Sequence, residues 1–140
     1  MKRLAAMLAL VVLATVNDAH AGRDPADAYS MRLGRLINDY RTQQGLQPLA
    51  LDAPLSTLAH EHATRMARED RLSHDDFQQR FRKARSPTCI ENVGSNHGTP
   101  EAEFEAWRNS PTHDRNLLDS RIARMGIAIE GRYVTFFACH

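Results

Sequence analysis

The N-terminus limits what this chain can fold into, because it has the layout of an export signal. Lys2 and Arg3 precede an uncharged apolar stretch at residues 4–16, and residues 19–21 read Ala-His-Ala, a small-x-small cleavage pattern. The apolar stretch is shorter than the roughly 20 residues that span a bilayer. We therefore expect residues 1–21 to be a cleaved signal peptide and the mature protein to be secreted or periplasmic, with no transmembrane segment. A retained amphipathic anchor or core helix is the alternative.

Cleavage would leave 119 of the 140 residues, which suits one domain with one modest core. These residues include sixteen basic and sixteen acidic side chains, so the mature chain is formally neutral. Neutrality argues against a general binder of nucleic acid. The basic cluster at residues 80–85 is accordingly interpreted as a solvated surface.

Cys89 and Cys139 are the only two cysteines, and they stand 50 positions apart. In an exported chain, a pair of cysteines predicts a disulfide. Chain entropy alone would make this cross-link worth about 4 kcal/mol. A redox or metal-thiolate pair is the alternative, and the lack of C-x-x-C spacing disfavours it.

Helical periodicity begins near Ala26 and predicts a helix that ends at Gly45. Residues 22–29 are interpreted as a flexible start and residues 30–140 as the folded domain. Asp52 and Pro54 predict the start of a second helix, because Asp caps helices and Pro fits their first turn. A shorter helix is expected from about Asp75.

The second half of the chain contains strand patterns around one further helix. Thr99 and Pro100 predict the start of that helix. The segment "THDRNLLDS" is interpreted as a loop or a single turn. Alternating residues from Met125, then Glu130-Gly131 and a β-rich tail, predict a C-terminal hairpin. Helices on a small antiparallel sheet make an α+β domain.

The segment "CIENVGSN" has the length of a strand but polar residues at its centre. Burying an unpaired carboxylate is costly, so Glu91 needs a partner. His74 and His113 lie on either side of Glu91 in the sequence, each at the end of an expected element. Two histidines and a carboxylate can bind a divalent metal or exchange protons as acid and base. Spacing alone leaves their convergence open.

The segment "AHEHAT" nearly matches the zinc-hydrolase pattern H-E-x-x-H, but Thr64 stands where the second histidine is required. His60 and His62 are two positions apart on a helix, so their side chains point in different directions and cannot share a metal. His62 falls on the apolar face of this helix. We interpret it as a core histidine.

Five segments in order, "LSHDD", "ENVG", "TPEAEFEAW", "SPTHDRNLL" and "MGIAI", resemble the CAP superfamily of cysteine-rich secretory, antigen 5 and pathogenesis-related proteins, and above all its short secreted bacterial members. The resemblance runs from about residue 30 to 138. It implies an α-β-α sandwich around a small antiparallel sheet, with a cleft where histidines and acidic residues gather. His74 and His113 match the two cleft histidines, and Glu91 matches the acid of the Gly-Glu-Asn motif.

The resemblance also implies what the cleft binds: a lipid- or sterol-like ligand, a protein or cell-envelope partner, or a divalent metal such as zinc or magnesium on His74 and His113 with Glu91. Asn92 is counted among the cleft residues, although satisfying buried backbone groups is its other role. Ile90 replaces the glycine usual in the family motif, and Ser110 stands where animal and plant members have a second acid. We expect Ile90 to change the local backbone, because a position that needs φ > 0 resists isoleucine. The missing second acid makes this a weaker metal site.

Three functions therefore remain open from the sequence. The first is a secreted binding protein that uses this cleft. The second is a hydrolase, peptidase-like in class, in which His74, Glu91 and His113 would activate water. No nucleophile motif accompanies them, so we expect binding rather than catalysis. The third is a structural domain in which the same residues form a buried polar network.

Overall fold

The structure is a computed structural model that describes residues 24–140, so the predicted signal peptide lies outside the described residues. The elements within this range, in chain order, are α1 (Pro25–Gln43), β1 (Ala50–Leu51), α2 (Ala53–Glu69), α3 (Phe77–Ala84), β2 (Cys89–Ser95), α4 (Pro100–Arg108), α5 (Pro111–Leu117), β3 (Arg124–Glu130) and β4 (Tyr133–Cys139). None of the helices in this range is both long enough and apolar enough to cross a membrane.

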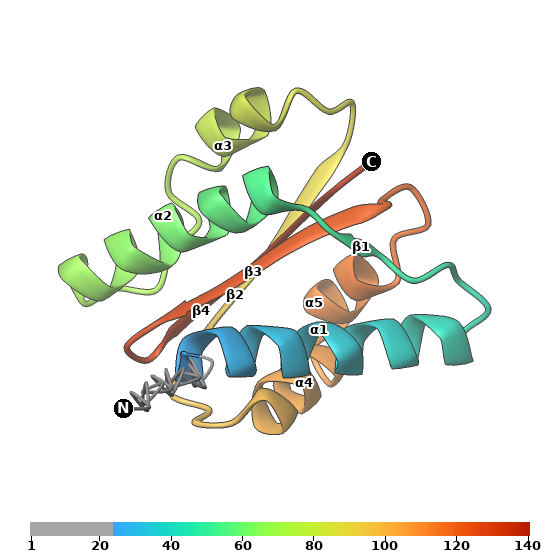
Figure 1. Cartoon of the computed structure of the whole chain (residues 1–140), viewed down its shortest axis with the longest axis horizontal. Coiled ribbons are helices and arrows are strands. Elements are labelled where there is room, and N and C mark those ends of the chain that lie inside the picture. Colours follow the sequence, from blue (N-terminus) through green and yellow to red (C-terminus); the bar gives the residue numbers. More distant parts are fainter. Residues whose placement is uncertain (1–23) are drawn as a thin grey trace, which may run out of the picture.

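A four-stranded sheet lies between two layers of helices (Figure 1). Helices α2 and α3 cover one face, and α1, α4 and α5 cover the other. The α+β sandwich expected from the sequence is confirmed. The sheet, however, is mixed, because the strand order is β1-β3-β4-β2 and the two-residue strand β1 runs parallel to β3. The other neighbours are antiparallel.

The predicted helix ends are confirmed by their capping contacts. Asp52 Oδ1 accepts a hydrogen bond of 2.9 Å from the N–H of Leu55 at the start of α2. Thr99 Oγ1 accepts one of 3.2 Å from the N–H of Ala102 at the start of α4. After α1, Gly45 adopts a φ of 77°, a left-handed conformation that glycine reaches without strain.

Two predictions about local structure were wrong. Helix α1 already begins at Pro25, so its first turn occupies part of the segment 22–29 that was expected to be flexible. Helix α5 replaces the loop or single turn expected after Pro111. Leu117 is its only buried residue, so its sequence carries no apolar periodicity from which a helix could be predicted.

Strand β4 is buried on both faces and organises the two cores. Phe136 packs with α1 and α4 residues such as Leu33 and Trp107, whereas Phe137 packs with α2 residues such as Leu55. The alternation along a strand explains this division. At the end of β4, the predicted disulfide between Cys89 and Cys139 is confirmed, and the two residues lie directly opposite each other on β2 and β4.

Candidate functional site

Glu91 lies in the middle of β2 with its side chain 1% exposed, and Arg80 of α3 balances its charge. Arg80 Nε donates to Glu91 Oε2 at 2.7 Å and Arg80 Nη2 donates to Oε1 at 2.8 Å. This is a bidentate ion pair, the geometry in which arginine binds a carboxylate most strongly. The interpretation of residues 80–85 as a solvated surface is therefore wrong for Arg80, which is buried.

His74 makes the third hydrogen bond to this carboxylate, from Nδ1 to Glu91 Oε1 at 2.9 Å. Burial by itself would raise the pKa of the Glu91 carboxyl, but the hydrogen bonds from His74 and Arg80 outweigh burial and hold that pKa below its ordinary value. An ionised carboxylate only accepts, so the ring proton of His74 lies on Nδ1. Its side chain is 53% exposed, which leaves the Nε2 side of the ring for solvent or a ligand.

His62 of α2 completes the buried network. Its Nε2 donates to the backbone oxygen of Ser73 at 2.7 Å and lies 3.8 Å from Glu91 Oε1. Burial lowers the pKa of His62; the charge of Glu91 opposes this effect and that of Arg80 adds to it, and the net shift favours the neutral ring. The interpretation of His62 as a core histidine is confirmed by its burial.

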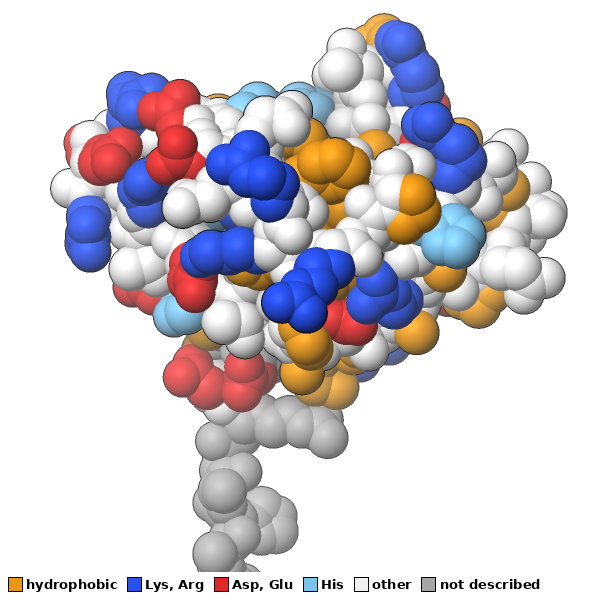
Figure 2. Space-filling view, turned by 90° about the horizontal axis from the view of Figure 1, so that it is seen from above, with side chains coloured by type: hydrophobic (Ala, Val, Ile, Leu, Met, Phe, Trp, Pro, Cys, Tyr) orange, Lys and Arg blue, Asp and Glu red, His pale blue; other side chains and the backbone are white. Residues whose placement is uncertain are grey.

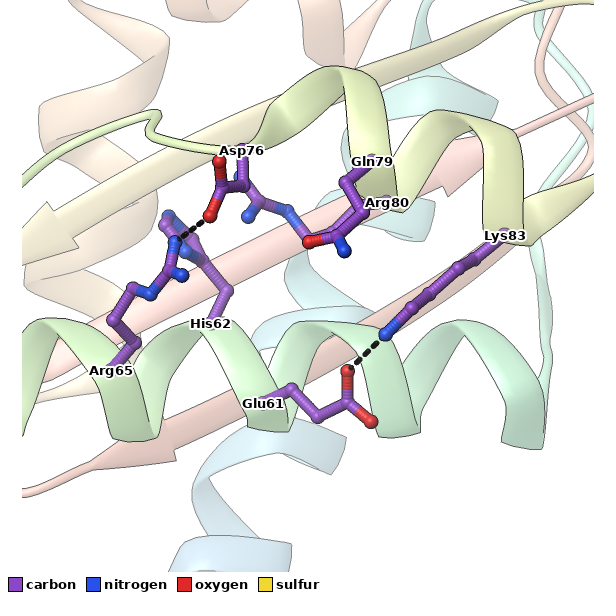
Figure 3. A pocket seen from close by; sticks show the side chains of 7 residues that line it. All are labelled: Glu61, His62, Arg65, Asp76, Gln79, Arg80 and Lys83. Carbon is purple, nitrogen blue, oxygen red and sulfur yellow. Dashed lines mark hydrogen bonds and ion pairs between the residues drawn. The ribbon is translucent and has the colours of Figure 1, made fainter.

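Helices α2 and α3 enclose His62 and Arg80 between two ion pairs (Figure 3). Lys83 of α3 lies 3.1 Å from Glu61 of α2, and Arg65 of α2 pairs with Asp76 just before α3. These contacts bridge the two helices on their exposed side. Their side chains are partly exposed, so these ion pairs add little to stability on their own.

His113 is joined to β2 through asparagines rather than through its ring. Asn92 Nδ2 donates to the backbone oxygen of His113 at 3.1 Å, and Asn116 Nδ2 donates to Asn92 Oδ1 at 2.8 Å and to the backbone oxygen of Glu91 at 3.2 Å. Burial lowers the pKa of His113, and the charge of His74 lowers it further. Asn92 is fully buried, so it satisfies backbone groups instead of facing the cleft.

A cleft of about 350 Å³ lies next to this network. It is lined by His74, Phe77, Cys89, Ile90, Glu91 and Asn116. Polar groups from His74 and Asn116 thus stand beside an apolar wall made by Phe77, Ile90 and the disulfide. The structure brings His74 and Glu91 into direct contact, and it links His113 to them through Asn116 and Asn92.

The donor set does not fit a divalent cation as it stands. Both oxygens of Glu91 already accept from Arg80, and a cation beside them would face the guanidinium charge. Across residues 24–140, no group of three histidine, cysteine, aspartate or glutamate side chains is arranged to hold a metal ion. The geometry therefore favours a cleft that works through hydrogen bonds and apolar contact.

The sandwich, its single disulfide and the histidine–carboxylate contact on β2 define an α+β class of domain. The chain matches the model of the cysteine-rich secretory protein family, CAP, over residues 35–140. The protein therefore belongs to the CAP family.

Similar proteins agree with this membership. The uncharacterized protein YkwD of Bacillus subtilis is 28% identical over 118 residues, which cover 79% of this chain and 46% of that protein. An extracellular protein containing a SCP domain from Bacillus anthracis has a similar structure, with a TM-score of 0.78 and 22% identity, over 82% of this chain and 41% of that one. An outer surface protein of Borrelia burgdorferi gives a TM-score of 0.72 and 21% identity, over 78% of this chain and 90% of that one. The chain spans less than half the length of its Bacillus subtilis relatives.

Sequence reasoning missed two features that shape the site and its surroundings. Arg80 could have been found by asking which cation neutralises a buried Glu91, because a basic cluster follows His74 closely in the sequence. Glu103 of α4 is the second feature: it is fully buried, and its Oε2 lies 2.9 Å from Nδ1 of His97. Its position four residues before Trp107 places it on the buried face of α4, unlike the exposed Glu101 and Glu105, and this spacing was the signal that could have found it.

Proposed function

We propose that this protein is an exported CAP-domain binding protein whose cleft beside His74 takes a small amphipathic ligand. One observation carries the proposal: the carboxylate of Glu91 is fully engaged by Arg80 and His74, while the outer side of the His74 ring faces a cleft with an apolar wall. Two proteins of similar structure are described as an extracellular protein and an outer surface protein, which supports export.

The chemistry of the cleft suits a ligand with an apolar body and one polar end. Phe77, Ile90 and the disulfide would contact the apolar body, whose burial contributes roughly 25 cal/mol per Å². His74 Nε2 accepts a hydrogen bond when the ring is neutral and donates one when it is protonated. A carboxylate or hydroxyl end group would therefore find a partner at His74.

Glu91 has a positioning role in this proposal. Its hydrogen bond fixes the ring orientation and tautomer of His74, and its pair with Arg80 ties α3 to β2. The residues that line the cleft include no serine, threonine or free thiol. This composition supports binding in preference to nucleophilic catalysis.

Calorimetry with decanoate as the probe tests the proposal. We expect the purified protein to bind decanoate and the His74→Ala variant to bind it at least ten-fold more weakly. The His60→Ala variant is the matched control, because His60 is exposed on α2 outside this cleft. Decanoate binding that His74→Ala leaves unchanged contradicts the proposal.

Titration with Zn²⁺ distinguishes the metal-site alternative. Our proposal expects no heat that depends on both histidines. If Zn²⁺ binds and His74→Ala and His113→Ala each abolish the heat, the cleft is a metal site and the amphipathic-ligand proposal is wrong.

A further inference from the structure

The outer edges of β2 and β3 differ in how far other parts of the chain cover their backbone groups. On the outer edge of β2, side chains occupy the backbone acceptors: Asn116 Nδ2 donates to the carbonyl of Glu91 at 3.2 Å, and Trp107 Nε1 donates to the carbonyl of Val93 at 3.3 Å. Such contacts close an edge that would otherwise pair with another chain. Side chains of α4 and α5 therefore cover the β2 edge and occupy two of its carbonyls.

The opposite edge, on β3, is paired only at its start. Strand β1 is in register with Arg124 and Met125 alone, and the carbonyl of Met125 accepts from the N–H of Asp52 at 2.9 Å. Backbone groups alternate along a strand, so those of Ile127 and Ile129 face the same side as those of Met125. Within residues 24–140 no hydrogen bond reaches the backbone of Ile127 or Ile129 from that side.

This unpaired stretch forms the floor of a groove of about 410 Å³ between α1 and α2. Figure 1 shows the two helices on either side of β3, with β1 covering one end of the strand. The walls carry small polar side chains, Ser30 from α1 and Ser56 and Thr57 from α2. The space therefore lies in line with β1, where a continuation of that strand would run.

The groove is acidic. Asp24, Asp27 and Glu130 line it, and no lysine or arginine does. None of the three carboxylates forms an ion pair within the described part of the chain. Figure 2 shows acidic side chains gathered beside the point where the described residues begin. Asp24 also caps α1, where its Oδ1 accepts from the N–H of Ala26 at 2.9 Å. A surface of one charge sign attracts a partner of the opposite sign and repels another surface of the same sign.

We propose that the open edge of β3 docks an extended segment of a protein partner rich in lysine and arginine, which pairs with Ile127 and Ile129 as a continuation of β1. Backbone pairing would supply the affinity, and the three carboxylates would select basic side chains on alternate positions. A second copy of this chain does not fit, because each copy would bring the same three carboxylates to the interface. The site is separate from the His74 cleft, and the inference does not depend on the ligand of that cleft.

Amide NMR of the purified protein with three blocked seven-residue peptides tests the proposal. The first peptide alternates lysine and valine, the second alternates glutamate and valine, and the third is the lysine peptide with its backbone N-methylated at every second residue. We expect the lysine peptide to shift the amide signals of Ile127 and Ile129 and to slow their hydrogen exchange at least ten-fold. The glutamate and N-methylated peptides should bind at least ten-fold more weakly.

Surface variants provide the matched comparison. Asp27→Asn combined with Glu130→Gln should weaken binding of the lysine peptide at least five-fold, whereas Asp39→Asn, an exposed acid farther along α1, should leave it unchanged. The proposal is overturned if millimolar lysine peptide moves neither amide, or if the N-methylated peptide binds equally well. It is also overturned if Ile127 and Ile129 are already as protected as Ala128 in the free protein, or if sedimentation shows a dimer that protects them.

Discussion

The carboxyl group of Glu103 on α4 rests directly on the backbone of Gly94 on β2, so that any side chain at Gly94 would overlap it. Glu103 is fully buried, Oε2 lies 2.9 Å from Nδ1 of His97, and Oε1 has no hydrogen-bond partner within residues 24–140. Gly94 is therefore required for close approach and not for an unusual backbone conformation. Helix α4 and strand β2 therefore approach each other closely at Gly94.

We predict that Gly94→Ala lowers the free energy of unfolding by about 1–3 kcal/mol, the usual cost of forcing extra atoms into a packed interior. Shortening the neighbour with Glu103→Ala should remove the overlap. The double variant is then expected to be more stable than the sum of the two single changes predicts. Urea unfolding of the wild type, both single variants and the double variant measures this coupling. Strict additivity would show that the two residues do not meet.

A second prediction concerns the pH dependence of stability at Glu103. Burial raises the pKa of its carboxyl above the ordinary value, and the hydrogen bond from His97 offsets only part of the rise. The stabilisation that this group supplies is present below its unfolded pKa of about 4.3 and is lost as the pH rises through the folded pKa. Glu103→Gln, which stays neutral, should therefore gain stability relative to the wild type as the pH rises from about 4 toward neutral.

Denaturant unfolding at several pH values checks this trend, with His97→Gln as a control because His97 forms a hydrogen bond with the same carboxyl. Tyr29 and Arg132 line the same pocket as Glu103 and His97, and neither residue is changed in these two variants. A difference between Glu103→Gln and wild type that stays constant across this pH range would contradict the raised pKa.

Glu91 should show the opposite trend, which gives a third prediction. Its folded pKa is depressed, so its stabilisation is present above the unfolded pKa of about 4.3 and is lost as the pH falls through the folded pKa. Glu91→Gln should accordingly be much less stable than the wild type at pH 6, and the gap should narrow toward pH 2. Denaturant unfolding at several pH values measures this difference in stability between Glu91→Gln and the wild type. A gap that widens on acidification would refute the assignment.

The local signals in the sequence were enough to predict most of the fold. Capping at Asp52 and Thr99 and the glycine at position 45 depend on neighbours within a few residues, so they are visible without tertiary structure. The α5 helix and strand β1 were missed because tertiary contacts, not periodicity, hold them. Two residues of β1 pair with β3 more than seventy positions away.

Features of the candidate site that depend on tertiary contacts were likewise not predictable from local sequence signals. Pairing a buried Glu91 with His74 follows from the resemblance of short motifs to a known family, and the contact of 2.9 Å agrees with it. The role of Arg80 depends on how α3 is placed over β2, which no local pattern records. Glu103 shares the buried face of α4 with Trp107, but its close approach to Gly94 depends on another element and is not visible in the local sequence.

The disulfide supports a fourth prediction. Cys89 and Cys139 join the first residue of β2 to the last of β4, 50 positions apart, and no cysteine is left over. Thiol titration of the unfolded, unreduced protein should find no free sulfhydryl. Reduction should cost about 2–4 kcal/mol and lower the melting temperature by several degrees. Two reactive thiols before reduction would contradict the cross-link.

The pair between Arg80 and Glu91 leads to the last prediction. Removing one partner of a buried ion pair leaves the other charge uncompensated, which costs about 3–5 kcal/mol, whereas replacing both by apolar residues of similar size is often close to neutral. Arg80→Met should therefore destabilise the protein more than Arg80→Met combined with Glu91→Leu. Arg71→Met is the control, because the ion pairs of Arg71 with Glu69 and Asp75 are exposed and its loss should have no measurable effect. If the double variant is less stable than Arg80→Met alone, Glu91 is held mainly by His74 and His62, and the guanidinium is not what neutralises it.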